Sequence, residues 1–283
     1  MRKLLFIGMV VLLAACKKGF LELAPSSDAN ASGFYHTAQD FNTAVSGAYA
    51  QLQNYPNMYL ELVSYRSDEL TLSAPTAGTQ DRYNIDKFSD DPSNQLLLDV
   101  WKNLYNGIAR CNEIITRLPD ATIEDGLKKQ YDAEAKFIRA YHYFNLVSFW
   151  GKVPLIERPL TAKEALKAGA SSIEEIFSML EDDLTDAITN LPSGFSGADI
   201  GRATSVAARA LLARIQLRAK KYVAVKATLQ PILPAGGKYD LLDDINQLFS
   251  ISNKNNKEIL FSVRFNKEIA GEGHSLWFTN NSA

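Results

Sequence analysis

The sequence predicts a mainly α-helical protein, an α-solenoid of stacked helix pairs with loop insertions. Two observations support this fold class. Apolar residues recur every three or four positions over much of the region 34–233, as they do on the buried face of a helix. The periodic stretches also come in pairs joined by short breaks, with alanines at positions where neighbouring helices would touch. Helix pairs that stack in this way bury one continuous core.

Three of the expected helices begin at recognisable capping residues. Thr37 precedes Asp40, and Ser172 precedes Glu175, in the spacing of a capping box. Thr204 stands before a third periodic stretch and can cap it. Between residues 54 and 92 the helical pattern breaks, so we expect this region to be the longest irregular segment.

The two clearest periodic stretches lie in the middle of the chain. The first carries apolar residues from Val100 to Ile115 and stops before Pro119. The second runs from about residue 123 to Trp150, and Gly151 then offers a left-handed cap. The aromatic residues on or beside these apolar stripes are expected to pack in the core: Trp101, Tyr105, Tyr141, Tyr143 and Trp150.

One helix pair near the end of the helical region is similar to a tetratricopeptide repeat. Its first helix contains Ala207-Ala-Arg-Ala-Leu-Leu-Ala213, and its shorter partner contains Tyr222 and Ala227. The character of the sequence changes after residue 250. Residues 259–265 partly alternate, which predicts a strand or an extended segment. We therefore expect a loop-rich second region to begin at this point.

The composition excludes some classes of function. The 283 residues carry a formal net charge of −2, and 46% of them are hydrophobic. A nucleic-acid-binding protein would carry a basic patch, so nucleic acid is not an expected partner. There are two cysteines, Cys16 and Cys111.

The first residues are typical of an exported lipoprotein. Arg2 and Lys3 precede an apolar run, residues 4–13, that is shorter than the roughly 20 residues needed to cross a bilayer. Leu13-Ala-Ala-Cys16 then resembles a lipobox, so residues 1–15 are predicted to be a signal peptide and Cys16 the site of lipidation. The alternative is an ordinary signal peptide followed by an incidental cysteine. Residues 16–33 are predicted to be a lipidated tether that anchors the protein to a membrane.

Five blocks in a fixed order resemble one known family. They span residues 101–115, 133–155, 176–187, 201–214 and 239–261, and include the motifs Trp150-Gly-Lys-Val-Pro-Leu155, Gly201-Arg-Ala-Thr204 and Glu258-Ile-Leu-Phe261. Together they resemble the SusD/RagB family of outer-membrane lipoproteins of Bacteroidetes. The resemblance extends from Cys16 to about residue 265. It implies a helical SusD-like N-terminal domain over residues 34–250. Members usually continue further, so residues 251–283 are expected to begin an incomplete C-terminal region, in a fragment or a truncated member.

The resemblance also implies a function. Members of this family are non-enzymatic binding proteins that capture glycans or other oligomeric nutrients at the cell surface. They deliver these ligands to a TonB-dependent (SusC-like) transporter. Position 17 is Lys, not the Asp that retains many lipoproteins at the inner membrane, so the outer membrane is the expected location. Two alternatives stay open: a helical envelope scaffold without a small ligand of its own, and a lipid-anchored glycan hydrolase.

Aromatic and polar residues of the irregular segment are candidate ligand contacts. Sugars bind to flat aromatic faces through their C–H groups, and amides and carboxylates bond their hydroxyls. The alternative, that individual tyrosines only pack the segment onto the helices, stays open. The candidate binding residues are Tyr55, Tyr59, Tyr65, Asp68 and Tyr83, with Trp277 near the end of the chain.

No catalytic or metal-binding motif is recognisable. The three histidines, His36, His142 and His274, lack the spacing of paired metal ligands. We therefore predict no catalytic residues, no metal and no cofactor. Three arginines recur in the family-like blocks and are expected to make buried or capping hydrogen bonds: Arg139, Arg202 and Arg214.

Overall fold

The computed structural model describes residues 34–54, 56–68, 70–75, 78–233 and 238–265. Within these residues the predicted mainly α-helical fold is confirmed. An isolated antiparallel β-bridge joins Pro154 to Ala170. Short 3-10 turns connect or follow the helices: η2 (Leu118–Asp120), η3 (Gly197–Asp199), η4 (Gln230–Ile232), η5 (Ile245–Gln247) and η6 (Ile251–Asn253). The helices are α2 (Ala38–Gln53), α3 (Pro56–Tyr65), α4 (Gln80–Asp86), α5 (Gln95–Arg117), α6 (Asp125–Trp150), α7 (Ala162–Ala165), α8 (Ile173–Asn190), α9 (Ser205–Arg218) and α10 (Tyr222–Leu229).

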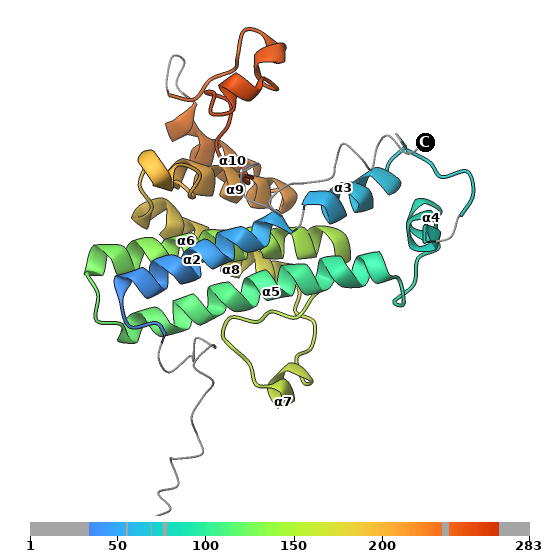
Figure 1. The fold of residues 1–283 in the computed structure, drawn as a ribbon, viewed down its shortest axis with the longest axis horizontal. Helices are drawn as coiled ribbons and strands as arrows, with labels where there is room; N and C mark the ends of the chain where they lie inside the picture. The colour runs from blue at the N-terminus through green and yellow to red at the C-terminus, as the bar shows by residue number, and fades with distance from the viewer. Residues whose placement is uncertain (1–33, 55, 69, 76–77, 234–237, 266–283) are drawn as a thin grey trace, which may run out of the picture.

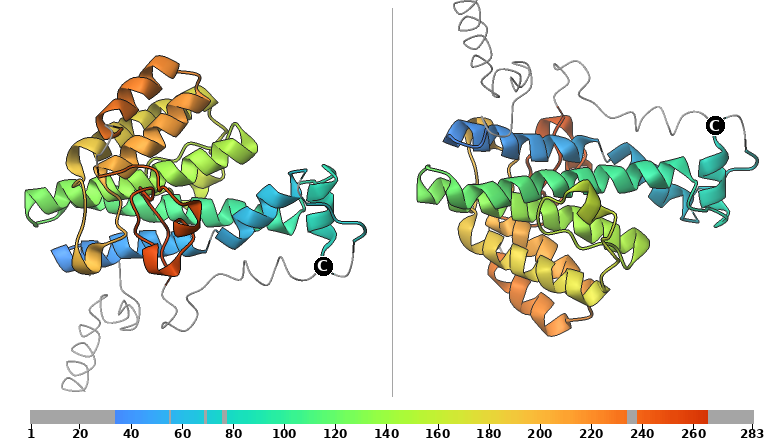
Figure 2. Two further views of the ribbon diagram at one scale, coloured as in Figure 1. Left: turned by 90° about the horizontal axis from the view of Figure 1, so that it is seen from above. Right: turned by 90° about the horizontal axis from the view of Figure 1, so that it is seen from below.

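The long helices are stacked in chain order. α5 packs on α6, α6 on α8, α8 on α9 and α9 on α10. Figure 1 labels these helices, and the views in Figure 2 show α5 and α6 between α2 on one side and α8, α9 and α10 on the other. This sequential packing is the solenoid-like arrangement predicted from the paired periodic stretches.

The capping residues predicted from the sequence do begin their helices. Thr37 accepts a hydrogen bond from the Asp40 amide at 3.2 Å, and Asp40 accepts one from the Thr37 amide at 2.8 Å. Ser172 and Glu175 form the same reciprocal pair at the start of α8. Thr204 caps α9 with its side chain. These bonds satisfy amides that have no partner inside the helix, which fixes where each helix starts.

The expectation that residues 54–92 are irregular is wrong in part. α3 occupies Pro56–Tyr65 and α4 occupies Gln80–Asp86. Pro56 is the first residue of α3, a position where the amide would have no helical partner, so the proline begins this helix and does not break it. α4 has seven residues, too few for a periodic pattern to be distinct.

The two long central helices end as the sequence predicts. α5 stops at Arg117, directly before η2, which contains Pro119. α6 ends at Trp150, and Gly151 follows with φ of 71°. Glycine adopts this backbone conformation at little cost because it has no Cβ atom. The amide of Gly151 donates to the Val147 carbonyl at 3.0 Å, which closes the last turn.

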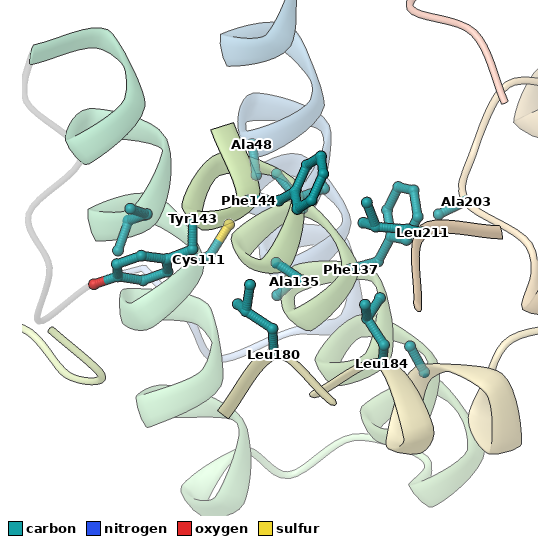
Figure 3. Packing of buried hydrophobic residues seen from close by; sticks show 14 of the residues in the cluster. Ala48, Cys111, Ala135, Phe137, Tyr143, Phe144, Leu180, Leu184, Ala203 and Leu211 are labelled. Atoms are coloured by element: carbon teal, nitrogen blue, oxygen red, sulfur yellow. The ribbon is translucent and has the colours of Figure 1, made fainter. Parts of the chain in front are cut away.

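The hydrophobic core lies among α2, α5, α6, α8 and α9. Figure 3 shows Phe137 and Tyr143 of α6 beside Leu180 and Leu184 of α8. Tyr143 is fully buried. The other aromatic residues expected in the core are partly buried and pack against the hydrophobic core, which confirms their structural role: Trp101, Tyr105, Tyr141 and Trp150. Among the described helices, none is both long and apolar enough to cross a bilayer.

Buried Arg139 and partly buried Arg202 tie separate parts of the fold together through hydrogen bonds, as expected from the sequence. Arg139 of α6 donates two hydrogen bonds to the Asp183 carboxylate of α8, at 2.7 and 2.8 Å. Burial raises the pKa of the Asp183 carboxyl, and these bonds oppose that rise. Arg202, in the segment before α9, lies 3.1 Å from both carboxylate oxygens of the fully buried Glu134.

Arg214 differs from this expectation. Its side chain is exposed, and its guanidinium carbon lies 5.1 Å from the centroid of the Phe144 ring. It borders a cavity of about 460 Å³ that is also lined by Tyr141, Leu211 and residues 258–263. Residues 261–265, the last described part of the chain, form neither a helix nor a strand. The Phe261 ring packs edge-on against Phe137, with 5.0 Å between centroids.

Candidate functional site

α3, α4 and their connections form a lobe at the N-terminal end of α5. This α3–α4 lobe comprises the described residues between 56 and 94, and Figure 1 shows it beyond the main helix stack. Leu62 of α3 and Ile85 of α4 are its fully buried apolar side chains. Both helices also contact α5, so the lobe is mounted on one of the two longest helices of the fold. Binding residues concentrate on loops held by such a scaffold.

Polar contacts fix α3 to α4. The Arg82 guanidinium of α4 donates two hydrogen bonds to the Glu61 carboxylate of α3, at 2.9 and 3.0 Å. These bonds raise the pKa of Arg82, since they favour its charged form. A bidentate pair fixes direction as well as distance, so the two short helices hold one relative orientation.

A second set of contacts holds the segment between the two helices. Asp86 accepts hydrogen bonds from the Leu72 amide at 3.0 Å and from the Thr71 hydroxyl at 3.1 Å. The Lys87 ammonium lies 2.8 Å from the same carboxylate and 3.0 Å from the Thr71 hydroxyl. The hydrogen bond from Lys87, followed by that from Leu72, holds the pKa of Asp86 below its usual value. The charged Asp86 therefore keeps residues 71 and 72 against the end of α4.

Phe88 is the most exposed aromatic residue of this lobe. Its side chain is 72% exposed, and its φ of 52° is in the left-handed region. A non-glycine residue there costs roughly 1–2 kcal/mol, and such strain is concentrated at functional sites. Arg66 lies over the ring, with its guanidinium carbon 6.0 Å from the centroid, and pairs with Asp90 at 2.7 Å. A flat apolar face therefore stands beside a guanidinium and a carboxylate.

That combination is suited to a sugar. The C–H face of a pyranose can stack on an exposed ring, and neighbouring charged groups can bond its hydroxyls. Phe88 is not among the binding residues predicted from the sequence. In the sequence Phe88 is a single aromatic residue between Lys87 and Ser89. Neither its exposure nor its backbone conformation can be read from the pattern of residue types.

The residues predicted from the sequence are distributed differently. Tyr59 is half-buried on α3 and packs edge-on against Phe149 of α6, with 5.7 Å between centroids. Tyr65 is also half-buried against the core, and burial raises the pKa of its hydroxyl. Asp68 is exposed in the turn after α3. Tyr83 lies on α4 with the Lys87 ammonium 5.5 Å from its ring centroid.

Tyr59, Tyr65, Asp68 and Tyr83 thus belong to the α3–α4 lobe, but the two α3 tyrosines pack against the hydrophobic core and are less exposed than Phe88. Their role in binding stays a prediction. Tyr55, Trp277 and the predicted lipidation site Cys16 lie outside the described residues. Among the residues that the structure describes, no group of three or more His, Cys, Asp or Glu side chains could hold a metal ion.

The stacked helix pairs define a helical-repeat protein, and comparison with known proteins identifies the family. The model of a SusD-like family, described as starch-binding and associating with the outer membrane, matches residues 19–217. The chain belongs to this SusD-like family. SusD-like proteins are binding proteins and not catalysts.

Relatives are similar in both sequence and fold. A SusD-like protein, P25, of Formosa agariphila is 29% identical over 95% of this chain and 52% of its own length. The crystal structure of a SusD-like protein from Bacteroides fragilis aligns with a TM-score of 0.75 at 27% identity, over 88% of this chain and 47% of that one. A laminarin-binding SusD-like protein aligns with a TM-score of 0.73 at 27% identity, over 80% and 51%. The chain therefore spans about half the length of these relatives.

Proposed function

We propose that this chain binds a glycan through the α3–α4 lobe, with the exposed ring of Phe88 as the surface on which a sugar stacks. The observation that carries the proposal is the geometry of Phe88, which is 72% exposed at a φ of 52° beside the Arg66–Asp90 pair. Family membership supports it, since one similar solved structure is of a laminarin-binding protein. A β-glucan such as laminarin is the first ligand to test.

The proposed location is the outer surface of the outer membrane. Residues 1–15 would direct export, and a lipid on Cys16 would anchor the protein through the tether of residues 16–33. The helical domain of residues 34–250 would then capture glycans and pass them to a TonB-dependent transporter. Replacing Cys16 with serine tests the anchor, and we expect the variant to leave the membrane fraction. Retention of Cys16→Ser in that fraction would contradict lipid anchoring at this residue.

Calorimetric titration of the whole protein with laminarin and starch oligosaccharides tests glycan binding. We expect Phe88→Ala to weaken the affinity by about tenfold or more, which corresponds to about 1.4 kcal/mol, because the stacked face is lost. Tyr222→Ala is the matched control, since Tyr222 is 65% exposed but lies on α10. Its affinity should equal that of the wild type.

The other outcomes separate the alternatives. Loss of binding in both variants would argue against a site at Phe88. Absence of binding across a broad glycan panel would favour a scaffold protein without a glycan ligand. Release of shortened oligosaccharides during the titration would favour a hydrolase.

A further inference from the structure

The α3–α4 lobe is more acidic than the rest of the chain. Residues 56–94 contain three basic side chains against seven acidic ones, a net charge of −4, whereas the whole sequence has a formal net charge of −2. Asp90 and Asp91 follow the exposed Phe88 after a single serine. A sugar that stacks on Phe88 therefore enters a region of negative potential.

Every basic side chain of the lobe already has a carboxylate partner. The side chain of each of these carboxylates is less exposed than that of the cation it contacts. An anionic group of a ligand would therefore meet a cation whose charge is compensated, and it would lie near the compensating carboxylate. Each cation lies within 2.9 Å of a carboxylate oxygen, in the pairs Arg66–Asp90, Arg82–Glu61 and Lys87–Asp86.

Three further carboxylates form no ion pair with the residues that the structure describes: Asp68, Asp81 and Asp91. Asp68 and Asp91 are exposed. Asp91 accepts hydrogen bonds from the hydroxyl and the amide of Ser93, at 2.6 and 2.7 Å, and Asp81 accepts one from the Gln95 amide at 3.1 Å. The bonds from Ser93 hold the pKa of Asp91 below its usual value. These bonds come from neutral groups, so they leave the negative charges uncompensated by a cation.

The guanidinium of Arg66 is the positive group that lies over the Phe88 ring. It is paired with Asp90 at 2.7 Å. A sulfate or carboxylate of a ligand that reached Arg66 would lie beside the Asp90 carboxylate, and like charges placed together oppose binding. A sugar hydroxyl carries no charge, and it can donate to Asp90 or accept from Arg66.

The hydrogen-bonding capacity of the lobe favours the same class of ligand. An ionised carboxylate only accepts hydrogen bonds, whereas a hydroxyl both donates and accepts. Sulfate and carboxylate groups of a polysaccharide are themselves acceptors without a proton to donate. A lobe rich in carboxylates is therefore complementary to a ligand rich in free hydroxyls.

We propose that the α3–α4 lobe selects an uncharged glycan and rejects polysaccharides that carry sulfate or carboxylate groups. This inference rests on the proposed function, because it concerns a sugar bound at Phe88, and it adds the charge class of that sugar. Its basis is electrostatic, since compensated cations and uncompensated carboxylates lie in the same lobe as the ring. Discrimination then comes from repulsion of the wrong ligand as well as from contacts to the right one.

Calorimetric titration of the whole protein with laminarin and with chemically sulfated laminarin tests the selectivity. The two polymers share one backbone and differ in their charged groups. At an ionic strength of about 0.01 M, where charges interact over roughly 30 Å, the sulfated form should bind about tenfold or more weakly than laminarin. At about 1 M, where this range falls to roughly 3 Å, the difference should largely disappear. Starch dextrin and its sulfated form provide a second pair.

Asp81→Asn combined with Asp91→Asn removes two charges and keeps an accepting side-chain oxygen at both positions. At low ionic strength this variant should bind sulfated laminarin about threefold or more tightly than the wild type, and laminarin equally well. The matched control is Asp243→Asn with Asp244→Asn. Both of these carboxylates are exposed outside the lobe, and Asp244 likewise accepts a hydrogen bond from a nearby amide. The control should bind both polymers as the wild type does.

The outcomes separate this inference from the proposed function. Equal or tighter binding of sulfated laminarin at low ionic strength overturns the selectivity, and the proposed function still stands if Phe88→Ala weakens laminarin binding. Weaker binding of the sulfated form that neither salt nor the Asp81 and Asp91 substitutions change indicates a steric effect and overturns the electrostatic account. Absence of binding to every neutral glycan overturns both.

Discussion

The imidazole of His142 on α6 lies directly against the backbone of Gly107 on α5. A Cβ atom added at Gly107 would come within 2.1 Å of the His142 Nε2 atom, closer than any real contact. The close approach of α5 and α6 at this point therefore depends on a glycine. Neither ring nitrogen of the fully buried His142 has a hydrogen-bond partner among the described residues. One contact thus combines tight packing with an unsatisfied polar group.

Gly107→Ala should destabilise the protein by about 2 kcal/mol. Alanine favours a helix by about 1 kcal/mol over glycine, but overpacking a core typically costs about 1–3 kcal/mol and this clash involves a fixed ring. Urea unfolding measures the difference. Gly47→Ala is the control, because the nearest atom to its added Cβ would be 3.4 Å away and that variant should gain stability. Equal stability changes in the two variants would contradict the account of Gly107.

The buried His142 should weaken the fold in acid. Burial lowers its pKa to about 3, whereas an unfolded histidine has a pKa of about 6.5. The unfolded state therefore binds more protons between these values, so stability falls as pH decreases from about 6.5 towards 3, by up to about 1.4 kcal/mol per pH unit.

His142→Leu should remove this part of the pH dependence. Leucine is similar in size to histidine and has no ring nitrogen that needs a partner. The variant should therefore be as stable as the wild type at neutral pH, or more stable. The measurement is the free energy of unfolding of both proteins between about pH 4 and 7. A constant difference between the two proteins across this range would contradict the prediction.

Asp183→Ala should cost about 3–5 kcal/mol, because it leaves the Arg139 charge buried without its partner. Replacing both residues with apolar side chains, as in Arg139→Met with Asp183→Leu, should recover most of that loss. Glu113→Ala breaks the more exposed pair with Arg117 on α5 and should cost about 0.5 kcal/mol or less. Thermal and urea unfolding would compare the three. Similar losses for Asp183→Ala and Glu113→Ala would contradict a structural role for the buried pair.

Phe88→Gly should separate stability from binding. Glycine adopts the φ of 52° without strain, so this variant should be more stable than Phe88→Ala by about 1 kcal/mol. Both variants lack the ring and should bind glycan equally weakly. Urea unfolding and calorimetric titration would measure the two effects. Equal stability of the alanine and glycine variants would argue against a strained backbone at this position.

The helix stack could be predicted from the sequence because its signals are local. Thr37, Ser172 and Thr204 mark helix starts, and the apolar periodicity of α5 and α6 extends over many turns. α3 and α4 were missed because α3 begins with Pro56 and α4 is too short for its period to be distinct.

The candidate site was less predictable because its features depend on tertiary structure. Tyrosines predicted from the sequence lie in the same α3–α4 lobe as Phe88, but Tyr59 packs against Phe149, which is distant in sequence. The exposure and positive φ of Phe88 follow from how the lobe is folded, and residue type alone does not report them. For the same reason the contact between Gly107 and His142 could not be foreseen.

The most direct test of the central claim is a crystal structure of the whole protein with the oligosaccharide that binds best in the titrations. The account predicts a pyranose ring stacked on Phe88 at about 4 Å, with Arg66 or Asp90 within hydrogen-bonding distance of its hydroxyls. A sugar bound elsewhere, with the Phe88 ring still free in solvent, would contradict it.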